Sequence, residues 1–185
     1  MMEKIFTEFS KQNKIDFYPL SVRNFSAYRV FEFSHIVKII SFLKFHPYVR
    51  MTILIDLFCA DFPNLEKRFE ISYSFLSLKL NKRFLLKINI SENDSIGSIA
   101  NIFVNSTWYE REIFDMFGVI FNCKMNRILT DYGFKGHPLR KDFPLSGNLE
   151  IRYDNNMKKI IHEPVVLDQE FRNFDFESEW KGPNY

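Results

Sequence analysis

Ionisable and aromatic side chains gather between Trp108 and Leu145, and this stretch is where the sequence could support chemistry. Its first half contains Glu110, Glu112 and Asp115 within a few residues of one another. Carboxylates at this spacing can act as general acids and bases or bind a hard cation. A metal site would usually include a histidine or a second carboxylate cluster nearby, and this first half offers neither. A solvated face of a capped helix is therefore the favoured interpretation.

The second half contains His137 in a Gly-His-Pro sequence, followed by Arg140, Lys141 and Asp142. A catalytic histidine needs a nucleophile or an orienting acid, and the sequence alone cannot place either one in space. The prolines at 138 and 144 instead predict a rigid loop whose side chains hydrogen-bond a partner.

Composition narrows the class of protein. The 185 residues, 46% of them hydrophobic, suffice for one domain with an extension. Cys59 and Cys123 are far apart and form no CxxC motif, which excludes a disulfide framework and a self-contained Cys-ligated zinc or iron–sulfur site. We expect both thiols to be buried hydrophobes in a reducing compartment. The 22 Phe are typical of an AT-rich, organellar or reduced genome.

The hydrophobic pattern predicts an α+β domain over residues 1–118, with a mainly antiparallel sheet and helices packed on one of its faces. Helices are expected at 2–12, 35–45 and 96–104. Apolar alternation predicts strands at 15–20, 27–33, 49–57 and, as an antiparallel hairpin, across 67–90. The apolar stretches are too short for a membrane span, and the N-terminus resembles neither a signal nor a transit peptide.

A last short helix is expected from Trp108 to Phe117. Thr107 and Glu110 have the spacing of a capping box, Arg111 and Asp115 are four residues apart and could pair, and Gly118 suits a left-handed C-terminal cap.

Residues 119–185 are predicted to be a long extended C-terminal arm that wraps a partner. Regular periodicity is lost between 121 and 147, and only a weak hairpin is expected at 149–163. Residues 124–141 contain five bases and one acid, whereas residues 142–185 contain five bases and nine acids. An arm with many rings and no core of its own needs another surface to lie on.

Several of these stretches resemble the 30 kDa subunit family of respiratory complex I. They are WYEREIFDMFGVIF, ILTDYGFKGHPLRKDFPLSG, EIRYD, EPVVLDQEFRNFDF, the terminal SEW and the strand RFEISYSFLSL. The resemblance extends from about residue 30 to about residue 180. It departs from the family at residues 122–126, where the family has a longer loop with a His-Pro-Asp-Leu element.

The resemblance implies a non-redox structural and assembly subunit of the peripheral arm of NADH:ubiquinone oxidoreductase, a proton-translocating enzyme, on the matrix side of the mitochondrial inner membrane. Neither a catalytic residue nor a cofactor or metal is expected on this chain. FMN and iron–sulfur clusters would lie in neighbouring subunits, and the partners would be the quinone-site (49 kDa-type) subunit and iron–sulfur subunits. The expected subunit-interface residues are Arg127, Asp131, Tyr132, Phe134, His137, Arg140, Lys141, Asp142, Phe143, Phe171, Phe174 and Trp180.

Three alternatives stay open from the sequence. One is the equivalent subunit of a hydrogenase-like or non-NADH quinone reductase complex. Another is a stand-alone enzyme that uses Glu110, Glu112 and His137. The last is an RNA-binding module built on the bases and rings of residues 127–141, which the small size of that patch and the acidic tail disfavour.

Overall fold

The computed structural model describes residues 2–20, 26–167 and 169, and its contacts divide the chain into two units, Met1–Leu145 and Ser146–Tyr185. The boundary expected after Gly118 falls inside the first unit. Of the predicted interface residues, Phe171, Phe174 and Trp180 lie outside the described part of the chain.

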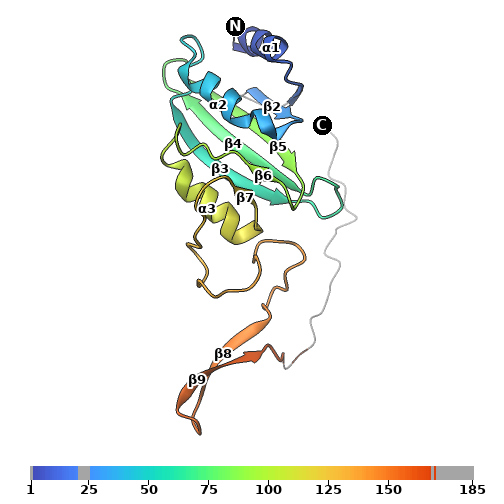
Figure 1. Ribbon diagram of the computed structural model, residues 1–185, viewed down its shortest axis with the longest axis vertical. Helices are drawn as coiled ribbons and strands as arrows, with labels where there is room; N and C mark the ends of the chain where they lie inside the picture. Colours follow the sequence, from blue (N-terminus) through green and yellow to red (C-terminus); the bar gives the residue numbers. More distant parts are fainter. Residues whose placement is uncertain (1, 21–25, 168, 170–185) are drawn as a thin grey trace, which may run out of the picture. The chain divides into compact units, whose positions relative to one another are not determined.

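The first unit is built on a five-stranded sheet in the order β1-β2-β5-β4-β3 (Figure 1). The strands are β1 (Phe17–Leu20), β2 (Ser26–Val30), β3 (Ile53–Asp61), β4 (Phe69–Ser77) and β5 (Lys82–Ile90). Neighbouring strands are antiparallel except β2 and β5, which run parallel. The chain is therefore an α+β protein with a mostly antiparallel sheet, as the pattern predicts.

The central hairpin follows directly from the alternation of apolar residues. In β4, Phe69, Ile71, Tyr73 and Phe75 are buried on one face, and the register pairs Phe69 with Ile90 across to β5. The predicted hairpin is confirmed. The β4–β5 register is unbroken, and the sheet's register shift lies in β3, between Leu54 and Asp56.

Helix α2 (Ile36–Phe45) lies across the apolar face of this sheet (Figure 1). Helix α1 (Met2–Asn13) packs on the same apolar side through Phe6, which contacts Tyr28 and Phe84. The ring of Phe6 lies 4.8 Å from those of Phe17 and Tyr28, and Phe9 stacks on Phe42 with centroids 3.9 Å apart. On α2 the buried positions follow a helical stripe, as predicted: Ile36, Ile39, Ile40 and Leu43.

The helix predicted at 96–104 is wrong. Residues Ser95–Ile96 form a short strand, β6, that pairs in parallel with β7 (Ile120–Phe121), and turns follow. Ile96, Ile99 and Phe103 are buried at the expected helical spacing. Distant partners nevertheless hold the backbone in another path, because the Ile99 amide donates to Glu110 and the Ile96 carbonyl accepts from Asn122.

Helix α3 (Ser106–Phe117) packs beside β3 in the first unit. The hydroxyl of Tyr109 donates to the Ile55 carbonyl at 3.0 Å, and the Asn105 amide donates to the Leu54 carbonyl at 3.0 Å. These bonds cover part of the exposed edge of β3. Gly118 ends the helix at φ +81°, which confirms the predicted left-handed cap.

The second unit contains one antiparallel hairpin, β8 (Leu149–Asp154) and β9 (Lys159–Pro164). The turn is stabilised by the Asp154 carboxylate, which accepts from the backbone amide of Asn156 at 2.7 Å. The hairpin predicted at 149–163 is thus confirmed.

Candidate subunit interface

Residues 122–145, which we call the anchored loop, are fastened to α3 by one carboxylate. Asp115 is fully buried, and its Oδ2 accepts the backbone amides of Ile128, Leu129 and Thr130 at 3.0, 2.8 and 2.9 Å. Its Oδ1 accepts from Nη1 of Arg127 at 2.7 Å. Burial acts to raise the pKa of Asp115, but the hydrogen bonds from Thr130, Leu129 and Arg127 outweigh it and hold the pKa well below the usual value.

The same cluster folds the loop back on the helix end. Nη2 of Arg127 donates to the Gly136 carbonyl at 3.1 Å, and the Leu139 amide donates to the Met116 carbonyl at 3.1 Å. Nδ1 of His137 lies 3.0 Å from the Asp115 carbonyl oxygen. Since that oxygen can only accept, Nδ1 carries the proton. His137 thus has a structural role at the cap of α3.

A second ionic cluster ties the end of the anchored loop to the sheet. Arg68 binds both oxygens of Asp61, at 2.5 and 2.7 Å, and also Asp142 at 2.7 Å. Asp61 accepts the Lys141 amide at 2.7 Å, and Arg140 pairs with Glu92. The hydrogen bonds from Arg68 lower the pKa of Asp61, and the same guanidinium lowers the pKa of Asp142 to about 2.

The sequence pattern does not predict the burial of Glu110, a candidate acid/base residue. It is fully buried, and its carboxylate accepts from the Ile99 amide at 2.8 Å and from the hydroxyls of Ser98 and Ser106 at 2.7 and 3.2 Å. The predicted capping box is wrong, because this carboxylate points into the protein instead of toward Thr107. Glu110 shares a helical stripe with Ile113, three residues on, which is the signal that could have revealed its burial.

Two further expectations from the sequence are corrected here. The sequence predicts that Glu110, Glu112 and Asp115 share an exposed helix face, but only Glu112 is exposed. Asp115 pairs with Arg127 and not with Arg111. A stand-alone enzyme built on Glu110, Glu112 and His137 is disfavoured, since two of these side chains are engaged inside the fold.

The two cysteines differ in how far they are exposed to solvent. Burial raises the pKa of Cys59 to about 12, so it stays a neutral thiol beside the core. Cys123 is exposed, contrary to expectation, although its sulfur lies 3.5 Å from Glu110 Oε2. Among the described residues, no three His, Cys, Asp or Glu side chains are grouped so that they could hold a metal ion.

The predicted interface residues of the anchored loop fall into two sets. Arg127, His137, Arg140 and Asp142 contact other parts of this chain, and Phe134 packs half-buried against Phe143 with ring centroids 5.8 Å apart. The exposed set consists of Asp131, Tyr132 and Lys141, and Tyr132 is 86% exposed. Exposed leucines accompany them at 129, 139 and 145.

The hairpin of the second unit has one apolar and one charged face. Register places Leu149, Ile151, Tyr153, Ile160, His162 and Pro164 on one side. On the other side, Arg152 pairs with Glu163 at 2.6 Å. Ile151 is 62% exposed, and its apolar neighbours on the same face are similarly open. An isolated two-stranded hairpin is marginally stable at best in water, and an exposed apolar patch of this kind marks an interaction surface.

Known proteins share both the fold and the sequence of this chain. A chain of the membrane-bound sulfane sulfur reductase, an archaeal respiratory membrane complex, superposes with a TM-score of 0.59 over 77% of this chain and 85% of that one, at 22% identity. This likeness shows the fold alone. Among the described residues, no helix has the length and apolar character needed to cross a membrane.

Sequence similarity is closer to bacterial relatives that bear the name of an NADH-quinone oxidoreductase subunit. The relative from Rickettsia felis is 48% identical over all of this chain and 89% of its own length. The protein of the same name from Azorhizobium caulinodans is 47% identical over 82% of this chain and 72% of its own length. Residues 30–149 match the family described as the respiratory-chain NADH dehydrogenase 30 Kd subunit. The chain therefore belongs to the 30 kDa subunit family of respiratory-chain NADH dehydrogenase.

Proposed function

We propose that this chain is a non-redox structural and assembly subunit of an NADH:quinone oxidoreductase. Its membership of the 30 kDa family and the names of its relatives support the parent complex. The structural observation that carries the proposal is the exposed apolar face of the β8–β9 hairpin, because such a face needs a partner to be buried.

In this proposal the chain holds neighbouring subunits in place. The hairpin, the exposed part of the anchored loop and the remaining arm dock on the quinone-site (49 kDa-type) subunit and on iron–sulfur subunits of the peripheral arm. FMN and the iron–sulfur clusters lie in those neighbours, and proton translocation belongs to the assembled enzyme. Docking of extended segments on larger subunits buries their apolar side chains, and this burial must outweigh the entropy lost when the segments become ordered.

The two ionic clusters give this docking surface a defined shape. Asp115 and Asp61 fix the backbone of the anchored loop at both ends, so Tyr132 and its neighbouring leucines are presented on a preorganised loop. Preorganisation lowers the ordering cost of association. This is why the predicted interface residues that turn inward, such as Arg127 and Arg140, matter to assembly through the loop conformation.

The location and the electron donor are part of the same proposal. A mitochondrial inner-membrane location stays a prediction, since the relatives named above are bacterial proteins. The alternative, an equivalent subunit in a hydrogenase-like or non-NADH quinone reductase, agrees with the fold likeness to the sulfane sulfur reductase complex. That likeness at 22% identity does not favour it over the NADH-linked complex.

The proposal is tested by purifying the affinity-tagged full chain from detergent-solubilised membranes of its host. We expect stoichiometric recovery of an assembly that contains FMN and iron–sulfur subunits and oxidises NADH with a quinone acceptor. Recovery of the chain without those subunits contradicts the proposal, and recovery with hydrogenase-type subunits supports the alternative.

A further inference from the structure

The face of the five-stranded sheet opposite α1 and α2 has a basic character. Pleating places Arg29, Glu70 and Lys87 on this face, on three adjacent strands. Glu70 accepts from Arg29 at 2.5 Å and from Lys87 at 2.6 Å. One carboxylate is thus shared by two bases, and the trio retains one unit of positive charge.

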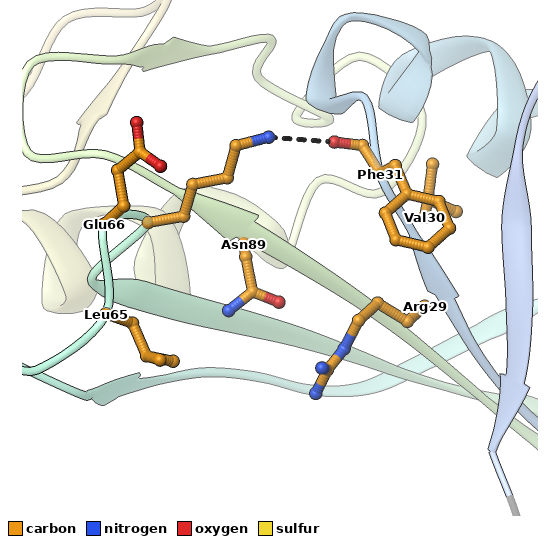
Figure 2. A pocket seen from close by; sticks show the side chains of 7 residues that line it. Arg29, Val30, Phe31, Leu65, Glu66 and Asn89 are labelled. Carbon is orange, nitrogen blue, oxygen red and sulfur yellow. Dashed lines mark hydrogen bonds between the residues drawn. The ribbon is translucent and has the colours of Figure 1, made fainter.

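This face ends in a hollow of about 330 Å³ (Figure 2). Arg29 and Asn89 enter it from the sheet, and Leu65 and Lys67 border it from the β3–β4 loop, with Phe31 on the far side. Phe31 and Leu65 are each 54% exposed. The hollow therefore combines nitrogen donors with an apolar rim.

The donors in the hollow have spare capacity. Nε of Arg29 is shielded from solvent yet has no hydrogen-bond partner among the described residues. The ammonium group of Lys67 makes a long bond, 3.4 Å, to the Phe31 carbonyl. The Asn89 amide lies between Leu65 and Arg29 (Figure 2). The carboxylate of Glu66 is directed away from Asn89 and Arg29. The Lys67 ammonium has three donors and makes only this long bond among the described residues, so an external acceptor in the hollow would be stabilising.

We propose that this hollow binds an aspartate or glutamate side chain of a neighbouring subunit, a second contact distinct from the hairpin. A carboxylate matches the guanidinium and ammonium donors, since charge-assisted bonds of this type are short and strong. The apolar rim favours a protein occupant over a free ion, because Phe31 and Leu65 can then pack on its flanking side chains. This inference rests on the proposed function, as it requires a partner subunit.

Zero-length carbodiimide cross-linking of the purified complex tests this directly, because it joins a lysine only to a carboxylate in contact with it. We expect an amide between Lys67 and an acidic residue of another subunit, identified by mass spectrometry. The substitution Arg29→Gln should lower its yield at least fivefold. Arg83→Gln is the matched control: Arg83 lies on the same face near the other end of β5, is exposed, and should leave the yield unchanged.

Other outcomes overturn the proposal. If Lys67 reacts with an amine reagent equally in the complex and in the isolated full chain, the hollow stays open in the complex. A link only to Glu66 shows that Lys67 contacts a carboxylate of its own chain. Protection of Lys67 by inorganic phosphate in the isolated chain, with no link in the complex, shows that the hollow binds a free anion instead. If the chain does not copurify with the complex at all, the proposed function fails and the cross-link is not expected. If the chain copurifies with the complex and Lys67 stays reactive, only the proposed binding of a carboxylate in the hollow is contradicted, and the proposed function stands.

Discussion

The carboxylate of Asp115, near the end of α3, accepts the backbone amide of Thr130 at 2.9 Å across fifteen residues of chain. This bond and its neighbours hold a stretch rich in Gly, Pro and charge against the end of α3. By its contacts within the chain, the loop belongs to the first unit, Met1–Leu145.

Replacing Asp115 by asparagine should destabilise the isolated chain by about 2–4 kcal/mol, because a buried carboxylate with several donors is replaced by an amide that brings two further donors. Arg127 also loses its charged partner. Urea denaturation at pH 7 measures the change. Glu112→Gln, on the exposed side of the same helix, should alter the unfolding free energy by less than about 0.5 kcal/mol. Equal effects of the two substitutions would contradict the anchoring role.

Acid should weaken the second ionic cluster over a defined pH window. The pKa of Asp142 is lowered to about 2 in the folded chain, against about 3.9 when unfolded. A lowered folded pKa contributes stability that is fully present above the unfolded value and is lost as pH falls through the folded one. The difference in unfolding free energy between the natural chain and Asp142→Asn should thus be constant from pH 7 to about 5 and shrink between about 4 and 2. A difference that is as large at pH 2 as at pH 7 excludes this linkage. Since Asp142 is half-exposed, added salt should reduce the effect.

Gly118 is expected to tolerate no side chain. Its φ of +81° disfavours any L-residue, and a Cβ there would meet the His137 ring at 2.7 Å. Gly118→Ala should therefore cost about 1–3 kcal/mol of stability. In the background of His137→Ala, which removes the ring, the same change should cost less, about 1 kcal/mol for the backbone alone. A double-mutant cycle measures this coupling, and strictly additive effects would show that the ring moves aside freely.

The parts of this fold that the sequence pattern predicts correctly are those set by local physics. Alternation predicts the β4–β5 hairpin, helical spacing predicts α2, and the need for positive φ predicts the cap at Gly118. Each depends on residues close together in the chain. The amphipathic β8–β9 hairpin is also visible in the sequence, because a polar turn lies between two short segments that mix apolar and charged residues.

The predictions that fail depend on partners far away in sequence. Lys141 donates its amide to Asp61 across 80 residues, and Arg127 reaches back 12 residues to Asp115. No periodicity records such pairs, so the contacts that the charges at 127 and 140–142 make within the chain cannot be predicted from the sequence alone. In the stretch 96–104, Ile96, Ile99 and Phe103 are buried but Val104 is 81% exposed. The Ile96 carbonyl, which a helix would pair with the amide of residue 100, accepts instead from Asn122, and the Ile99 amide donates to Glu110.

The hairpin supplies the sharpest test of the assembly role, because its two faces provide their own control. Ile151 is on the apolar face and is 62% exposed, so Ile151→Asp removes little packing from the isolated chain. Its unfolding free energy should change by less than about 0.5 kcal/mol.

In the complex, the same side chain would be buried against a subunit, and an unpaired carboxylate there would oppose docking. We expect the amount of chain recovered with the complex to fall at least fivefold for Ile151→Asp. Glu150→Gln, one residue away on the charged face, should leave recovery unchanged, since register turns it to the other side of the pleat. Quantitative mass spectrometry of membranes that express each variant decides the matter. Equal recovery of both variants would show that the apolar face is not the docking surface, whereas loss of both would mean that the hairpin fold, and not one of its faces, is what assembly requires.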